Sequence, residues 1–161
     1  MPVKNPSTKT GHPLRGVTLG EKQTVLLARR FGSLLRGGEL VCLRGALGSG
    51  KTTFVRALIR GFGIKSSVRS PTFVLLNRYF VRFGQVRCLI HVDGYRLKSW
   101  RDLEGLGLLD YLGRPDTIVL IEWPPRGRPP TNGPVVKISL KPRGLRNRTY
   151  SITTAVPRSS R

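Results

Sequence analysis

A glycine-rich segment of eight residues constrains this chain more than any other feature of its sequence. Residues 45–52 read Gly-Ala-Leu-Gly-Ser-Gly-Lys-Thr and match the phosphate-loop pattern G-x-x-x-x-G-K-[ST]. The apolar run at residues 40–43 predicts a buried strand before the loop, and residues 53–60 predict a helix after it, ending at Gly61. A strand, a glycine-rich turn and a helix in this order are the context that the motif requires. This context disfavours the alternative of a glycine-rich turn that binds nothing.

The residue types in this segment suit a polyphosphate ligand. Glycines let backbone N–H groups converge on phosphate oxygens without Cβ clashes, and the start of the helix adds a partial positive charge. We expect Lys51 to reach the β- and γ-phosphates of a nucleotide, and the Thr52 hydroxyl to ligate Mg²⁺. The predicted nucleotide-binding residues of the loop are Gly48, Ser49, Gly50, Lys51, Thr52 and Thr53.

Length and composition indicate a globular protein with one folded domain. The chain has 161 residues, 39% of them hydrophobic, and its apolar runs are too short to span a bilayer. We expect a flexible basic tail over residues 1–18, a single P-loop ATPase domain over residues 19–155 and a flexible tail over residues 156–161. The basic N-terminal segment lacks the pattern of an organelle-targeting leader, and with no apolar signal segment we expect a cytoplasmic protein. Cys42 and Cys88 are interpreted as packed thiols rather than a disulfide or a metal pair.

The charge balance is strongly basic. The chain carries 29 Lys and Arg against 8 Asp and Glu, a net charge of +21, and residues 123–161 contain no acid. Such a field favours polyanions, RNA among them. The alternative is a general drift of composition toward arginine, and the sequence leaves both open. The basic residues of this region are Arg126, Arg128, Lys137, Lys141, Arg143, Arg146, Arg148, Arg158 and Arg161.

The pattern along the chain predicts an α/β fold: a P-loop NTPase-like sheet, mostly parallel with antiparallel edge strands, with helices on its faces. Besides the strand and helix around the loop, we expect a helix over residues 20–36 and a hairpin from residues 73–83 and 86–92. A mixed segment with leucines at helical spacing follows over residues 95–112, and then a buried strand over residues 117–121. A proline-rich loop over residues 124–134 leads to an edge hairpin from residues 135–140 and 148–154.

Two of the eight acids follow predicted buried strands directly. Asp93 ends the strand of residues 86–92, and Glu122 ends the strand of residues 117–121. In an open α/β sheet, ligands bind at the carboxyl ends of the strands, where the phosphate loop also opens. Both carboxylates could therefore hold Mg²⁺ and orient an attacking water, although either could instead be a solvated or salt-bridged acid. The other acids are interpreted as surface charge: Glu21, Glu39, Asp102, Glu104, Asp110 and Asp116.

Four motifs, in order and spacing, resemble the TsaE family. They are the phosphate loop continued to Arg56, Ser-Pro-Thr-Phe at residues 70–73, His-Val-Asp-Gly-Tyr-Arg-Leu at 91–97, and Ile-Glu-Trp-Pro at 121–124. The resemblance covers about residues 24–154. It implies a small ATPase, with ATP and Mg²⁺, required for bacterial tRNA threonylcarbamoyladenosine biosynthesis. It also implies a complex with TsaB and TsaD, in which TsaD modifies adenosine 37 of tRNA and ATP hydrolysis supports turnover by the TsaD–TsaB pair.

The resemblance also implies roles for individual residues. Lys51 would neutralise the phosphates, Thr52 and Glu122 would bind Mg²⁺, and Asp93 would be a further essential acid. Thr72 resembles the hydroxyl of a loop that senses the γ-phosphate, giving the predicted catalytic set Lys51, Thr72, Asp93 and Glu122. Thr24 falls where the family has a threonine near the nucleotide base. Packing is expected for Trp123 against the site, and for His91 and Trp100 with no assigned chemistry.

The chain departs from the family pattern at Ala46, Arg78 and Pro125, each of which replaces a usual or frequent acid. None of the three is an assigned phosphate or metal contact. Two other functions remain open at this point: a small P-loop kinase, for which no acceptor-binding acid is evident, and a non-catalytic basic RNA-binding module, which lacks interleaved aromatic residues.

Overall fold

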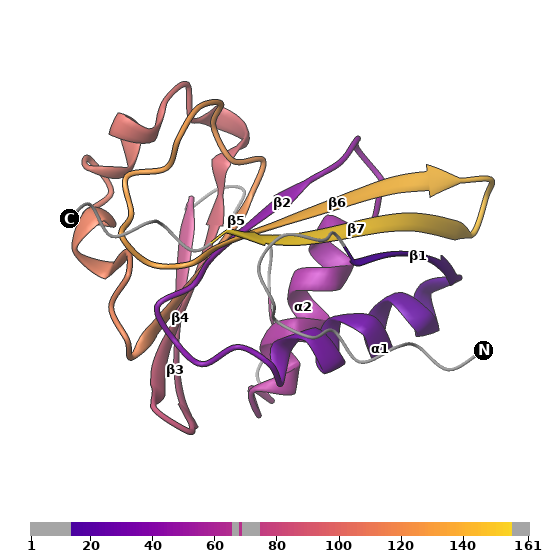
Figure 1. Ribbon diagram of the computed structural model, residues 1–161, viewed down its shortest axis with the longest axis horizontal. Coiled ribbons are helices and arrows are strands. Elements are labelled where there is room, and N and C mark those ends of the chain that lie inside the picture. The colour runs from indigo at the N-terminus through magenta and orange to yellow at the C-terminus, as the bar shows by residue number, and fades with distance from the viewer. Residues whose placement is uncertain (1–13, 66–67, 69–74, 156–161) are drawn as a thin grey trace.

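A single mixed sheet forms the centre of the molecule. The computed structural model describes residues 14–65, 68 and 75–155, and within them seven strands pair in the order β1-β7-β6-β2-β5-β4-β3 (Figure 1). The strands are β1 (Leu14–Leu19), β2 (Leu40–Arg44), β3 (Leu76–Phe83), β4 (Val86–Asp93), β5 (Thr117–Glu122), β6 (Val135–Arg143) and β7 (Asn147–Ala155).

The inner strands are parallel and the outer ones antiparallel. β6, β2, β5 and β4 run parallel to one another, while β3 pairs antiparallel with β4, and β7 and β1 follow antiparallel on the other side. All six residues of β5 are buried, as expected for a strand inside a parallel sheet with both faces covered. The predicted α/β class, with antiparallel strands at the edges, is confirmed.

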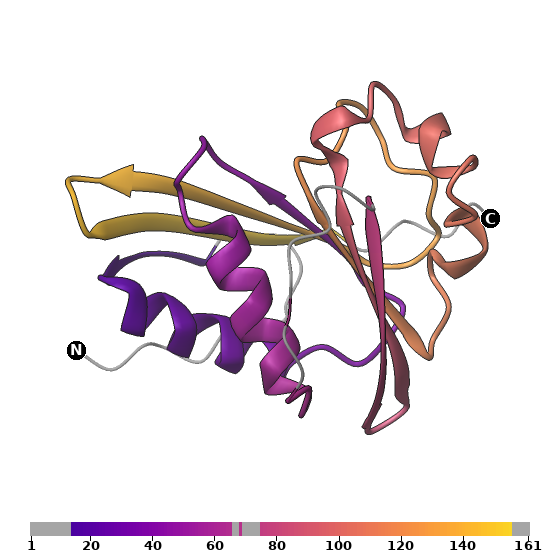
Figure 2. The same cartoon turned by 180° about the vertical axis from the view of Figure 1, so that it is seen from behind.

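Two α-helices cover one face of the sheet. α1 (Glu21–Gly32) and α2 (Lys51–Gly61) pack against each other and against the same face, and the reverse view places both on one side again (Figures 1 and 2). Phe54 is fully buried there, and its ring lies 6.2 Å from that of Phe31. The helix predicted over residues 20–36 ends earlier, at Gly32, because the N–H groups of Leu34 and Leu35 bond three residues back and tighten the chain into turns.

The opposite face is covered by short 3₁₀ turns instead of α-helices. The mixed segment forms η1 (Gly94–Arg96), η2 (Trp100–Leu103) and η3 (Leu109–Tyr111). Leu103 and Leu108 are buried there beneath the sheet residues of a second apolar cluster. The start of η2 is fixed by the Asp102 carboxylate, which accepts from the N–H groups of Lys98 and Ser99 at 2.7 and 3.1 Å. These backbone hydrogen bonds lower the pKa of Asp102.

The first strand corrects one predicted boundary. Residues 14–18, assigned from sequence to a flexible tail, form most of β1, which pairs along its length with β7 from Leu14 opposite Ile152 to Leu19 opposite Asn147. The pairing satisfies backbone groups that β7 would otherwise expose. The hairpin of β6 and β7 is therefore not at the edge of the sheet. The rest of the predicted tails, residues 1–13 and 156–161, lie outside the described residues.

The two cysteines are packed thiols, as the sequence indicated. Cys42 on β2 and Cys88 on β4 are buried and unpaired, with β5 lying between their strands. Burial raises the pKa of the Cys42 thiol to about 12. No helix in the described part of the chain has the length and apolar character needed to cross a membrane.

Candidate functional site

The phosphate loop joins β2 to α2 at the carboxyl edge of the parallel strands. Gly50 adopts a left-handed conformation (φ 94°) immediately before α2 begins at Lys51. A Cβ at Gly45 would lie 2.3 Å from the carbonyl oxygen of Leu140 on the neighbouring strand β6, so the turn can pass that strand only with glycine. The loop is thus seated against the sheet, directly before the N-terminus of α2, and the start of a helix offers N–H groups without an intrahelical partner.

Lys51 is buried in the centre of the loop, with 5% of its surface exposed. Its Nζ donates to the carbonyl oxygens of Gly45 and Ala46, both at 2.9 Å. It also lies 3.8 Å from the ring centroid of Trp123, within cation–π range. Burial lowers the pKa of Lys51, and the nearby carboxylates of Glu122 and Asp93 oppose that shift. The ammonium therefore has carbonyl and carboxylate partners, but they do not fully offset the effect of burial on its charged form.

Trp123 closes the site beyond the end of β5. Its φ of 54° is left-handed, a conformation that bulky residues rarely adopt. Its N–H nevertheless donates to the Leu43 carbonyl oxygen of β2 at 3.1 Å, and the ring of Tyr95 packs edge-on against the indole with centroids 5.5 Å apart. Contacts on both sides therefore hold the backbone turn that aims the indole at Lys51.

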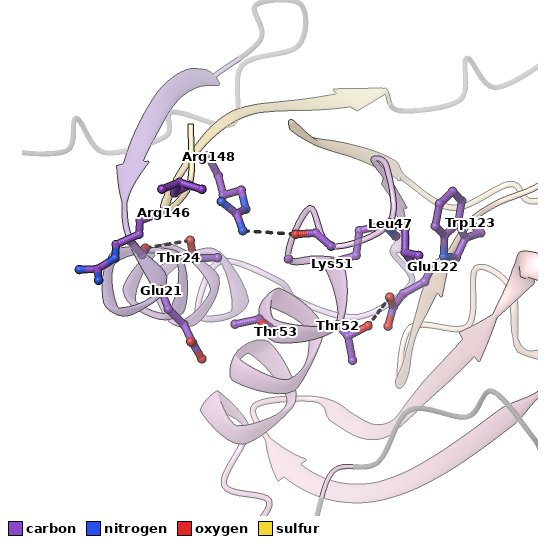
Figure 3. A pocket seen from close by; sticks show the side chains of 14 residues that line it. Glu21, Thr24, Leu47, Lys51, Thr52, Thr53, Glu122, Trp123, Arg146 and Arg148 are labelled. Carbon is purple, nitrogen blue, oxygen red and sulfur yellow. Dashed lines mark hydrogen bonds between the residues drawn. The ribbon is translucent and has the colours of Figure 1, made fainter. Parts of the chain in front are cut away.

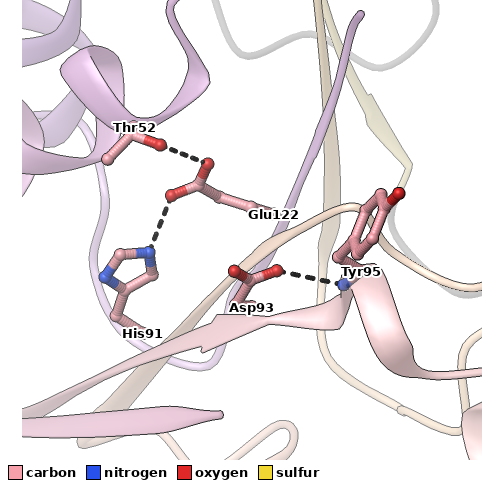
Figure 4. A network of polar contacts seen from close by, with 5 residues as sticks. All are labelled: Thr52, His91, Asp93, Tyr95 and Glu122. Atoms are coloured by element: carbon pink, nitrogen blue, oxygen red, sulfur yellow. Dashed lines mark hydrogen bonds and ion pairs between the residues drawn. The ribbon is translucent and has the colours of Figure 1, made fainter. Parts of the chain in front are cut away.

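Glu122 bridges the phosphate loop to β4. One carboxylate oxygen accepts from the Thr52 hydroxyl at 2.8 Å, and the other accepts from the Nε2–H of His91 at 2.9 Å (Figure 4). Glu122 is 4% exposed and His91 is completely buried. The Nδ1 atom of His91 has no partner among the described residues. A proton on Nε2 fits this arrangement, since the oxygen of a carboxylate accepts the hydrogen bond.

Asp93 lies beside Glu122 but is used differently. The two residues are paired in register across β4 and β5. Asp93 is partly exposed, and its Oδ1 accepts from the Tyr95 N–H at 3.0 Å, which caps η1 (Figure 4). The ends of the strands come close because Gly94 has no side chain: a Cβ there would lie 2.6 Å from the Trp123 carbonyl oxygen. Asp93 thus keeps one carboxylate oxygen free of the cap.

A pocket of about 540 Å³ opens over the loop, a size typical of small-molecule sites. Figure 3 shows Glu122 and Trp123 on one side of it and Thr24, Arg146 and Arg148 on the other. Its walls come from the loop and α2, the end of β5, the junction of β1 and α1, and the turn between β6 and β7.

Arg148 holds the loop from the basic side of this pocket. Its Nε donates to the Ser49 carbonyl oxygen at 3.1 Å and its Nη2 to that of Gly48 at 3.2 Å. A third hydrogen bond, from Nη1 to the Asn147 carbonyl oxygen at 2.8 Å, fixes the guanidinium itself. The sequence predicted Arg148 only as one of the basic residues that could meet RNA, whereas the structure also places it in the wall of the pocket over the phosphate loop.

Thr24 and Glu21 reach the pocket from the start of α1. Thr24 is 3% exposed, and its hydroxyl lies 3.0 Å from that of Thr18 on β1. Glu21 is exposed, as expected for a surface charge, and it also lines the same wall of the pocket. Strand β1 therefore shapes this end of the site, a contribution that its basic sequence did not signal.

Most of the predicted site residues lie together around the pocket over the phosphate loop. Lining the pocket are Thr24, Gly48, Gly50, Lys51, Thr52, Thr53 and Glu122. Ser49 is a fully buried residue of the loop, and Asp93 is not among the residues that line the pocket. Thr72 lies outside the described residues. His91, for which packing alone was expected, is instead the buried polar partner of Glu122.

Thr52 and Glu122 are the pair that could hold a divalent cation. No group of three or more His, Cys, Asp or Glu side chains suited to a metal is present in the ranges the structure describes. Mg²⁺, however, usually takes one or two protein oxygens and keeps several waters or phosphate oxygens. The Thr52 hydroxyl and Glu122 carboxylate oxygens, 2.8 Å apart, fit that requirement.

A phosphate loop between β2 and α2, in a sheet whose inner strands are parallel, defines a P-loop protein of the α/β class. Comparison with known proteins narrows the class further. The family model described as threonylcarbamoyl adenosine biosynthesis protein TsaE matches residues 18–150, and the chain belongs to the TsaE family.

Several curated relatives carry the name tRNA threonylcarbamoyladenosine biosynthesis protein TsaE. The one from Aquifex aeolicus is 42% identical over 111 residues, 68% of this chain and 75% of the relative. The one from Treponema pallidum is 35% identical over 139 residues, 86% of this chain and 99% of the relative. A similar solved structure is Bacillus subtilis YdiB, with a TM-score of 0.67, 27% identity and coverage of 91% of this chain and 87% of that chain.

Proposed function

We propose that the protein binds ATP together with Mg²⁺ at the phosphate loop and hydrolyses the ATP to ADP and phosphate. One observation carries the proposal: the buried carboxylate of Glu122 contacts the Thr52 hydroxyl of the loop while His91 holds its second oxygen. A glycine-rich turn without a nucleotide would have no need for a buried acid at this point, because burying a carboxylate is costly unless each oxygen is satisfied.

Each residue of the site has a chemical task in this proposal. Lys51 turns from the Gly45 and Ala46 carbonyl oxygens to the β- and γ-phosphates, where its charge offsets the charge that develops in the transition state. Thr52 and Glu122 hold Mg²⁺, which when bound neutralises phosphate charge. His91 keeps the Glu122 carboxylate in one orientation.

Two further tasks fall to the neighbouring residues. The uncapped oxygen of Asp93 is available to orient a water molecule for attack. Arg148 fixes the shape of the loop by holding the Gly48 and Ser49 carbonyl oxygens. A γ-phosphate contact by Thr72 stays a prediction.

The relatives' names supply the biological process. We place this activity in threonylcarbamoyladenosine biosynthesis on tRNA, where the hydrolysis supports turnover by a transferase complex of TsaD and TsaB. The support is membership of the TsaE family over residues 18–150, together with relatives that carry this process in their names.

The test is hydrolysis of ATP by the purified chain, with and without Mg²⁺ and with and without TsaB and TsaD. We expect Mg²⁺-dependent turnover that Lys51→Ala abolishes, with weaker nucleotide binding, because a positive charge leaves the phosphates. Arg82→Ala removes an exposed cation from β3, remote from the pocket, and is the matched control. Turnover of Lys51→Ala at the wild-type rate would contradict the proposal.

A further inference from the structure

A second pocket lies against the first residues of the phosphate loop, Gly45 and Ala46. It has a volume of about 580 Å³ and is bordered by residues 44–46 of the loop, the segment from η1 to Lys98, and the chain after β5. It shares only Trp123 with the first pocket. None of the roles assigned above uses this space.

The walls of the second pocket are cationic. Arg44, Lys98 and Arg126 line it, all three are exposed, and no acidic residue is among its lining residues. Arg44 is held in place by a hydrogen bond from its Nη2 to the Pro125 carbonyl oxygen at 3.0 Å, which leaves its other N–H groups available. Cations gathered around a concave surface without an acid attract a ligand with more than one negative charge.

The pocket also presents one exposed aromatic ring. Tyr95 is 72% exposed, although its backbone is fixed by the bond to Asp93. Its ring stands edge-on to Trp123, at an interplanar angle of 76°, and the indole is itself held by Lys51. This contact fixes the phenol ring, so that stacking on it costs little further ordering. An exposed aromatic ring beside cations is the arrangement with which proteins bind unpaired bases.

We propose that this pocket binds one nucleotide of a single-stranded RNA segment, with the base stacked on Tyr95 and the adjacent phosphates bound by Arg44, Lys98 and Arg126. RNA supplies both a flat ring and a row of negative charges, whereas an acidic peptide supplies only the charges. The volume lies in the range of sites that enclose a small molecule. That this RNA is tRNA rests on the proposed function. That the ligand is RNA rests on the chemistry of the pocket alone.

The test is the salt dependence of binding to a fluorescently labelled oligouridylate, measured by anisotropy without ATP. Each lost phosphate contact to a single strand lowers the slope of log K against log salt by about 0.7. Lys98→Glu/Arg126→Glu should therefore reduce the slope by at least about 1.4. The charge-matched control is Arg15→Glu/Arg82→Glu, which changes exposed residues of β1 and β3 outside the pocket. The control should keep the wild-type slope.

Tyr95 separates stacking from charge in the same assay. Tyr95→Ala should weaken binding about tenfold at an unchanged slope, in line with the loss of one stacked base. Tyr95→Phe should keep the affinity, because the phenol oxygen is not needed for stacking. Thermal melting checks that each variant folds, and Lys98→Gln/Arg126→Gln replaces the charge reversal if that variant does not.

Three results would overturn the proposal. If the slope of log K against log salt falls equally in the pocket variant and its control, binding depends on net charge alone. If Tyr95→Ala keeps the wild-type affinity for RNA, no base stacks on Tyr95. Polyglutamate that competes with the RNA at equal charge and shows the same sensitivity to Tyr95→Ala would make the occupant an acidic polypeptide. Because ATP hydrolysis is measured separately, a failure here leaves the proposed ATPase function standing, and the reverse also holds.

Discussion

The phosphate loop has an acidic side and a basic side, and the two are built differently. On the acidic side, at the ends of β4 and β5, the buried Glu122 is bonded to side chains at both oxygens. On the basic side, Arg148 comes from β7, is partly exposed, and donates only to main-chain carbonyl oxygens. In the proposed ATPase, this difference implies a division of labour: the acidic side would take part in the chemistry, and the basic side would maintain the shape of the loop.

The largest effect is expected on the acidic side. Glu122→Gln keeps the size of the side chain but removes the charge that would hold Mg²⁺, so turnover should fall about 100-fold or more while nucleotide binding through the loop largely persists. Turnover measured across a Mg²⁺ titration checks it. Glu104→Gln, at an exposed position on the 3₁₀ face, is the matched control and should behave as wild type. Normal turnover of Glu122→Gln would make this acid structural.

The basic side should respond in KM rather than kcat. Arg148→Ala removes two hydrogen bonds that hold the loop carbonyl oxygens. The KM for ATP should therefore rise about tenfold, because losing roughly 1.4 kcal/mol of charge-assisted hydrogen bonding weakens binding by that factor. Arg146→Ala serves as the comparison, since the Arg146 side chain is exposed on the same wall and forms no hydrogen bond or ion pair with the described residues. Steady-state kinetics separate the two parameters. A fall in kcat alone would place Arg148 in the chemical step and end the division of labour.

Asp93 offers a smaller test within the acidic side. Asparagine at this position can still accept from the Tyr95 N–H, so Asp93→Asn keeps the cap of η1 and loses only the charge beside the pocket. We expect turnover to fall about tenfold, below the roughly 10²–10⁴-fold that a general acid or base contributes, because the asparagine side-chain oxygen can still orient a water molecule. If Asp93→Asn loses as much as Glu122→Gln, both acids act directly and the register pair works as a unit.

The smallest effect is expected on the thermal stability of the protein, at Lys51, which lies between the acidic and the basic side of the loop. Burial lowers the pKa of Lys51 below its ordinary value of 10.5, so the unfolded chain binds this proton more tightly than the folded one, and the charged lysine opposes folding at neutral pH. Lys51→Met, which keeps an unbranched side chain one atom shorter and removes its charge, should therefore melt a few degrees higher than wild type while hydrolysing no ATP. The gap should close as pH rises from the lowered pKa toward 10.5, because wild type then gains stability. Melting curves across that pH range measure it, and a lower melting temperature for Lys51→Met would show that the Gly45 and Ala46 hydrogen bonds outweigh the burial.

The sequence predicted the acidic side because its evidence is local. Phosphate loop, Asp93 and Glu122 each follow a buried strand directly, and parallel strands bring their carboxyl ends to one edge. Arg148 stands 99 residues after Ser49 and reaches the loop only because β6 and β7 fold back beside β2. No spacing in the sequence marks that return.

Strand β1 was missed, and the 3₁₀ face was predicted only as a mixed segment, for related reasons. β1 is specified by its pairing with β7, a contact across nearly the whole chain, and not by its own basic and weakly apolar residues. In residues 95–112, leucines at intervals of three suit a 3₁₀ turn as well as an α-helix, and Gly105 and Gly107 decide against the longer element. His91 was undervalued because the sequence does not show what a buried side chain faces.

The indole of Trp123 gives the protein a built-in optical probe. Its ring has the Lys51 ammonium over one face and packs steeply against the ring of Tyr95, so its excited state senses a charge that would move away if Lys51 turned to a phosphate. Trp100, buried among the 3₁₀ turns, supplies a constant second emission. Intrinsic fluorescence can therefore report the departure of Lys51 from its resting contacts in the unlabelled protein, in real time and without a coupled assay.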